Sequence, residues 1–185
     1  MSDPVSALGH AAFDGFARIR EIGPLGMITL RARADLPALP AAVRAATGLD
    51  LPAVRRIVTA GDRSIGWMSP DEWLIVLPYP QVAQTLARLS EALQGQHHLA
   101  ADVSDARAVF RIEGARAGDV LMKLSPVDQA RLEPGELRRT RAAQVACALW
   151  REGDGYTLVC FRSVAGYVMG LLTHSAQPGS EIFPA

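Results

Sequence analysis

The sequence predicts an α+β fold made of two copies of one β-α-β-β-α half. Two observations carry this prediction: the same order of apolar patterns occurs twice, and aromatic residues flank a hairpin turn at the same spacing in both copies. Trp67 and Trp73 flank the first turn, and Trp150 and Tyr156 flank the second. We expect the two halves to pack about an approximate internal two-fold axis. A chain of 185 residues, 49% of them hydrophobic, is long enough to bury such a core.

The first half shows one strand, a short helix, a hairpin and a second helix. The short helix begins at Pro40 and ends at Gly48, as helices often do, and the second carries Val82, Leu86, Leu89 and Leu93 on one stripe. The predicted elements are strand 27–33, helix 40–48, strands 63–68 and 73–78, and helix 80–95.

The second half repeats this order with a different turn sequence. We expect its last helix to be capped by Ser163. The predicted elements are strand 108–114, helix 115–125, strands 144–150 and 156–162, and helix 163–174. The predicted organisation is an N-terminal arm (1–26), two halves (27–98 and 99–176) and a C-terminal tail (177–185).

Both hairpins are apolar on both faces, so we expect each face to pack against another part of the chain or against a partner protein. The N-terminal arm adds a further apolar surface, because Val5, Leu8, Ala12, Phe16 and Ile19 fall on one stripe if the arm is helical. A stripe outside the repeat has no internal partner. We therefore expect a partner protein on the arm and the hairpins, with Phe13, Phe16, Trp67 and Trp150 as contact residues, and not on the basic cluster at Arg138, Arg139 and Arg141.

Asp71 and Glu72 form a carboxylate pair between two tryptophans, which invites an assignment as a general acid and base. They follow Pro70, which favours a turn, and the second copy has Glu152-Gly153-Asp154-Gly155 at the same place. The two repeats share the position of this turn but not its residues. We therefore interpret the Asp71-Glu72 pair as a structural part of the turn.

Composition and motifs exclude several functions. Basic and acidic residues both number 19, which gives no reason to expect a nucleic-acid partner. No P-loop and no dinucleotide-binding glycine motif is present, and the histidines lack metal-ligand spacing. The sequence therefore offers no catalytic, cofactor-binding or metal-ligating set.

The chain shows no secretory or membrane signal. The longest apolar run, 164–172, is too short to span a bilayer, so we expect a cytoplasmic protein without membrane attachment. Cys147 and Cys160 are too few for a disulfide framework, and we expect both to be free thiols.

Residues 101–135 contain Asp-x-Ser, a strand ending in glycine, a helix and a closing Pro-Gly turn. This stretch resembles the folate-binding fold shared by the glycine-cleavage aminomethyltransferases (GcvT) and the YgfZ-type proteins. Together with "GWMSPDEWLIVLP" before it and residues 139–172 after it, it is similar to the gamma-subunit family of heterotetrameric sarcosine oxidase. The cysteine-containing motif of the YgfZ proteins is missing, and the chain is too short for the extra domains of the aminomethyltransferases.

The resemblance implies an accessory subunit that is not catalytic by itself. In that family, alpha, beta and delta subunits are the partners, and FAD, FMN, NAD, zinc and tetrahydrofolate belong to those other subunits. The complex oxidises sarcosine to glycine. Two alternatives remain open at this stage: a free-standing protein that binds a small folate-like ligand, and a homodimeric structural domain.

Overall fold

The computed structural model describes residues 4–182 and divides the chain into two compact units. Leu25–Ser104 form the central unit, and Met1–Pro24 together with Asp105–Ala185 form the terminal unit. This division differs from the expected one, because the N-terminal segment is not a separate arm. It belongs to the same unit as the C-terminal half of the chain.

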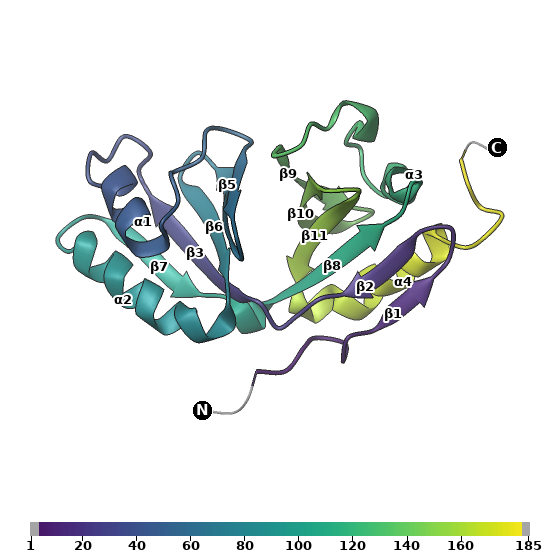
Figure 1. Cartoon of the computed structure of the whole chain (residues 1–185), viewed down its shortest axis with the longest axis horizontal. Helices are drawn as coiled ribbons and strands as arrows, with labels where there is room; N and C mark the ends of the chain where they lie inside the picture. The colour runs from purple at the N-terminus through teal and green to yellow at the C-terminus, as the bar shows by residue number, and fades with distance from the viewer. Residues whose placement is uncertain (1–3, 183–185) are drawn as a thin grey trace. The chain divides into compact units, whose positions relative to one another are not determined.

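The central unit has a five-stranded antiparallel sheet in the order β4-β5-β6-β3-β7 (Figure 1). Gly48 ends helix α1 in the left-handed conformation, with φ of 78°, which glycine adopts at little cost. The elements are β3 (Gly26–Ala32), α1 (Leu39–Thr47), β4 (Ile57–Ala60), β5 (Arg63–Ser69), β6 (Glu72–Leu77), α2 (Val82–Ala92) and β7 (His98–Asp102).

The terminal unit has a six-stranded antiparallel sheet in the order β1-β2-β8-β11-β10-β9. A short 3-10 turn, η3 (Gln129–Arg131), lies in the connection between α3 and β9. The elements are β1 (Ala12–Asp14), β2 (Arg18–Glu21), β8 (Arg107–Glu113), α3 (Ala117–Met122), β9 (Leu137–Ala142), β10 (Val145–Glu152), β11 (Gly155–Phe161) and α4 (Ala165–Ser175).

The predicted α+β class and the repeat are confirmed, but five of the eleven strands in residues 4–182 were not predicted: β1, β2, β4, β7 and β9. Strands β4 and β9 were missed because they are edge strands, and β9 is rich in exposed arginine. Strands β2 and β7 were missed as well. In the sequence, β2 comes before β3 and β7 comes before β8. The pairing is exchanged, because β2 pairs with β8 and β7 pairs with β3.

The prediction of a helix over residues 5–19 was wrong. Gly9 and His10 both have φ of 62°, which is incompatible with a right-handed helix, and the segment instead forms β1 and β2 beside β8 (Figure 1). Buried Glu21 holds the preceding turn, because its carboxylate accepts hydrogen bonds from the backbone N–H groups of Ala7 and His10 at 2.8 and 2.9 Å.

Both faces of the terminal sheet are buried, as the two-sided apolar pattern predicted. Phe110, Leu149 and Leu158 belong to a core that also contains residues of α3 and α4. Val109, Ala148, Trp150 and Val159 lie on the other face and are also buried. The sheet therefore exposes neither face to solvent over these positions.

The start of α4 differs from the prediction. The helix begins at Ala165 after a 3-10 turn over Arg162–Val164, and its N-cap is Val164, without a side-chain capping hydrogen bond. Ser163 therefore does not cap it. The 3-10 turn continues directly from β11 and takes the place of a capped helix start.

Candidate functional site

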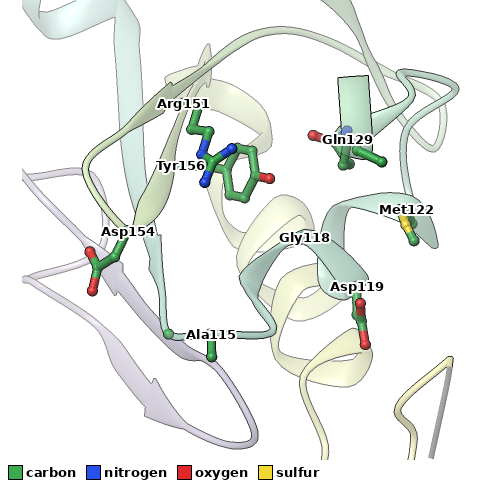
Figure 2. Close-up of a pocket in the computed structure, with 10 residues that line it drawn as sticks. Ala115, Gly118, Asp119, Met122, Gln129, Arg151, Asp154 and Tyr156 are labelled. Carbon is green, nitrogen blue, oxygen red and sulfur yellow. The ribbon is translucent and has the colours of Figure 1, made fainter. Parts of the chain in front are cut away.

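A pocket of about 320 Å³ lies within the terminal unit, where the β10–β11 hairpin faces α3 and η3 (Figure 2). Its lining comes from four places in the chain: the loop after β8, helix α3, the turn η3 and the hairpin. The lining residues are Gly114, Ala115, Gly118, Asp119, Met122, Gln129, Ala130, Arg151, Asp154 and Tyr156.

Tyr156 and Arg151 form one wall of the pocket. They are directly opposed in the register of β10 and β11, and Figure 2 shows the two side chains close together. Tyr156 is only 8% exposed. Burial raises the pKa of its hydroxyl, and the charge of Arg151 opposes this effect without cancelling it. The hydroxyl is therefore a neutral hydrogen-bonding group at physiological pH.

Gln129 lies on the opposite wall, and only one of the two polar atoms of its side-chain amide forms a hydrogen bond within residues 4–182. It is 4% exposed, and its Nε2 donates to the backbone oxygen of Val127 at 3.0 Å. Its Oε1 is buried and accepts no hydrogen bond from residues 4–182. In Figure 2 this oxygen is on the side of Gln129 that faces Tyr156. A buried acceptor without a donor is unfavourable by about 1–3 kcal/mol, so the site suits a donor from outside.

Helix α3 contributes a carboxylate and a close approach of its backbone to Tyr156. Asp119 forms an ion pair with Arg116 at 2.6 Å through Oδ2. Gly118 faces Tyr156, and a Cβ placed on it would lie 3.3 Å from the tyrosine hydroxyl oxygen. Any larger residue at 118 would therefore narrow the pocket.

The four side chains expected to contact a partner are less available than the sequence suggested. Phe13 and Phe16 pack against the core of their own unit, and the cations of Arg116 and Lys123 lie 5.9 and 5.0 Å from the centre of the Phe16 ring. The premise of an unpartnered arm was therefore wrong.

The two tryptophans of that set also differ from each other. Trp150 is 6% exposed, which leaves little of it for a partner, whereas Trp67 is half-buried. Trp67 pairs with Trp73 across β5 and β6, but Trp150 pairs with Thr157, not with Tyr156. A register shift near Trp67 produces this difference at equal sequence spacing.

Asp71 lies in the turn between β5 and β6, as expected. Its carboxylate accepts a hydrogen bond from Ser69 Oγ at 2.8 Å and pairs with Arg31 at 2.9 Å. The Ser69 hydrogen bond, followed by Arg31, holds the pKa of Asp71 below its usual value. These contacts stabilise the charged form in an exposed turn, which is the opposite of what a general acid requires.

Residues 4–182 contain no group of three or more His, Cys, Asp or Glu side chains placed to hold a metal ion. No helix in that range is long and apolar enough to cross a membrane. Cys147 and Cys160 are buried, directly opposed and unbridged.

The sequence motif Asp-x-Ser has a structural role in the central unit. Ser104 Oγ accepts a hydrogen bond from the backbone N–H of Met27 at 2.9 Å, and Asp102 accepts the Ser104 backbone N–H at 2.9 Å. The motif therefore joins the end of β7 to the start of β3. The profile of the family described as "Sarcosine oxidase, gamma subunit family" matches residues 31–177, which include this motif.

The chain belongs to the sarcosine oxidase gamma subunit family. A curated relative in Corynebacterium sp. (strain U-96), "Sarcosine oxidase subunit gamma", is 37% identical over 122 residues. The aligned part covers 62% of this gamma-family chain and 57% of that relative. The chain thus matches little more than half the length of the curated relative.

Solved structures agree with the family assignment. A chain of the heterotetrameric sarcosine oxidase from Corynebacterium sp. U-96, in complex with pyrrole 2-carboxylate, matches this gamma-family chain with a TM-score of 0.81 and 27% identity. The match covers 91% of this chain and 88% of that one. The glycine cleavage aminomethyltransferase T from Bartonella henselae matches with a TM-score of 0.65 at 13% identity, over 85% and 45% of the two chains. The expected GcvT-like fold is therefore confirmed.

The pocket itself was missed at the level of sequence. Tyr156 was noted only as an aromatic flank of the hairpin, and Gln129 lies in a stretch without periodicity. The one available signal was Arg151, whose place opposite Tyr156 follows from the predicted hairpin.

Proposed function

We propose that this chain is the gamma subunit of a heterotetrameric sarcosine oxidase and that it acts as an accessory subunit without catalysis of its own. The observation that carries the proposal is the match to a chain of that complex over 91% of this chain, at a TM-score of 0.81. The family profile over residues 31–177 supports it independently.

In this proposal the partners are alpha, beta and delta subunits in the cytoplasm, with the alpha subunit as the main contact. The flavins FAD and FMN, together with NAD, zinc and tetrahydrofolate, are assigned to those subunits. The whole complex demethylates sarcosine to glycine. The contribution of this chain is then a surface that holds the complex together.

Helix α4 is the surface that we assign to the partner. It contains no Asp, Glu, Lys or Arg over its eleven residues, and its exposed positions include Gly166, Gly170 and Tyr167, of which the tyrosine is 50% exposed. Helix α2, which also follows a hairpin, exposes Arg88 and Glu91 instead. The cores of protein interfaces are depleted in charged residues, and the outer face of α4 shares this property.

The two glycines allow a direct test of this surface. A Cβ on Gly166 or Gly170 would meet nothing within 4 Å, so the double variant Gly166→Arg/Gly170→Arg leaves the internal packing intact. The variant and the wild type are each co-expressed with tagged alpha, beta and delta subunits. We expect the apparent Kd for assembly to rise at least about tenfold, because burying unpaired charges costs several kcal/mol.

Helix α2 supplies the matched control. Ala83→Arg/Ala87→Arg introduces the same charges at the same spacing on an exposed helix face, and we expect normal assembly. Normal assembly of the α4 variant would place the contact elsewhere, with half-buried Phe13, Phe16 and Trp67 as the next positions to replace. A wild-type chain that joins none of the three subunits would overturn the proposed function and favour a free-standing small-molecule-binding protein.

A further inference from the structure

We propose that the pocket between the β10–β11 hairpin and α3 binds a small α-amino acid as a zwitterion. This inference goes beyond the proposed function, because it concerns a ligand of this chain itself. It rests on the guanidinium of Arg151 on the hairpin wall of the pocket, and on one buried acceptor on the opposite wall that has no donor among residues 4–182.

The hairpin wall suits a carboxylate. Arg151 forms no ion pair with a carboxylate among residues 4–182, and its guanidinium lies beside Tyr156 (Figure 2). Asp154 of the same hairpin also lines the pocket, but Figure 2 shows its carboxylate well apart from Arg151. Guanidinium groups bind carboxylates through paired, charge-assisted hydrogen bonds. The neutral Tyr156 hydroxyl adds a further donor. A ligand carboxylate on this wall would therefore have donors from two side chains.

The α3–η3 wall suits an ammonium group. Gln129 Oε1 is a buried acceptor without a donor in the described chain. Figure 2 shows the Asp119 carboxylate away from Gln129, and its Oδ2 accepts a hydrogen bond from Arg116, so we assign the ammonium group to Gln129. An ammonium group has donors only, so it can satisfy the oxygen of Gln129.

The size and lining of the pocket restrict the ligand further. About 320 Å³ is at the lower end of the range for ligand pockets, which fits an amino acid and excludes a dinucleotide. Met122 provides apolar surface for a small side chain. A simple anion would leave Gln129 Oε1 without a donor, and a simple amine would leave the guanidinium without a counter-charge.

Calorimetric titration of the full-length chain tests this assignment with four probes: glycine, sarcosine, acetate and methylamine. We expect the two zwitterions to bind with Kd on the order of 1 mM, since so few atoms limit affinity. Acetate and methylamine each supply only one of the two charges, and we expect each to bind at least about tenfold more weakly.

Two variants address the two walls. Gln129→Met keeps the size of the side chain and removes the acceptor, and we expect glycine affinity to fall about 10- to 100-fold, the loss typical of a hydrogen bond to a charged group. Arg151→Gln changes an exposed side chain, so the fold is retained. It should abolish the preference for glycine over methylamine.

Matched controls lie outside the pocket. Gln84→Met on α2 makes the same replacement at an exposed position, and glycine should bind it as it binds the wild type. The proposal is overturned if no zwitterion binds the wild type, if methylamine binds as tightly as glycine, or if a folded Gln129→Met variant keeps full affinity. If Gln129→Met fails to fold, Arg151→Gln alone decides: unchanged discrimination rejects the site. Assembly with the other subunits is a separate measurement, so the two proposals can fail independently.

Discussion

The two units share one strand order but differ in the helix that follows the first strand of each repeat. In the central unit, α1 has nine residues and ends in a left-handed glycine before a short connection to β4. In the terminal unit, α3 has six residues and is followed by an irregular stretch containing η3. The pocket lies where α3 ends, with Gly118, Met122 and Gln129 around it. A shorter helix in one of two repeats can thus leave a ligand-sized space while the strand order of the sheet is kept.

A second difference lies at the end of the sheet. Strand β7 ends the central sheet, whereas the terminal sheet continues beyond β2 to β1. The segment around β1 is fixed at its turn, because the backbone N–H of Phe16 donates to the oxygen of Ala176 at 3.0 Å. The terminal unit therefore depends on a close backbone approach between the start and the end of the chain.

The largest effect on stability is expected at that approach. A Cβ on Gly15 would lie 1.9 Å from the backbone oxygen of Ala176, so Gly15→Ala must displace backbone. We expect a loss of about 1–3 kcal/mol or more in the free energy of unfolding of the terminal unit. Chemical denaturation followed by circular dichroism measures it.

Gly166→Ala is the control for this substitution. Gly166 lies in α4 with nothing within 4 Å of its Cβ position, and a helical Gly→Ala change stabilises by about 0.5–1 kcal/mol. Equal effects of the two substitutions would mean that the contact of Gly15 with Ala176 does not hold the N-terminal segment in place.

The fold was predictable where a pattern repeats, and unpredictable where pairing depends on distant strands. Val82 and Leu89 marked α2 because both face the core at helical spacing. The 5–19 segment also showed a helical stripe, yet it forms strands because the edge of β8 supplies hydrogen-bond partners and buried Glu21 fixes the turn. Tertiary pairing outweighs such a short local pattern.

The candidate site was less predictable than the fold. Gln129 matters because its oxygen is buried without a donor in the described part of the chain, and burial of one atom depends on three-dimensional packing. The pairing of Arg151 with Tyr156 was within reach of the sequence, but no sequence pattern placed η3 opposite the hairpin. The turn at Asp71 was predictable, because Pro70 favours a turn and the other repeat has different polar residues at the same place.

An intermediate effect is expected for the reactivity of the two thiols, which belong to the terminal unit. Burial raises the pKa of Cys147 to about 12 and that of Cys160 to about 11. Only the thiolate reacts, so alkylation of the native chain at pH 8 should be at least about 100-fold slower than that of the unfolded chain. Mass spectrometry should show two added groups after unfolding without reductant.

This measurement reports on the terminal unit alone, because neither cysteine lies in the central unit. Gly15→Ala should accelerate native-state alkylation, and Gly166→Ala should not. Rapid alkylation of both thiols in the native wild type would contradict their burial, and the absence of added groups after unfolding would indicate a disulfide.

The smallest effect is expected for Asp71→Asn in the exposed turn of the central unit. The Ser69 hydroxyl and Arg31 hold the pKa of Asp71 below its usual value, so the charged form is favoured in the folded chain. The resulting stabilisation is present above the pKa of the unfolded state, roughly 3.9, and is lost as the pH falls through the lower folded-state pKa. Exposed ion pairs contribute little. We therefore expect a slightly lower urea midpoint for the variant at pH 7 and convergence with the wild type at strongly acidic pH. A reconstituted complex carrying Asp71→Asn should oxidise sarcosine at the wild-type rate, and a large loss of turnover with assembly intact would restore the catalytic interpretation of this carboxylate.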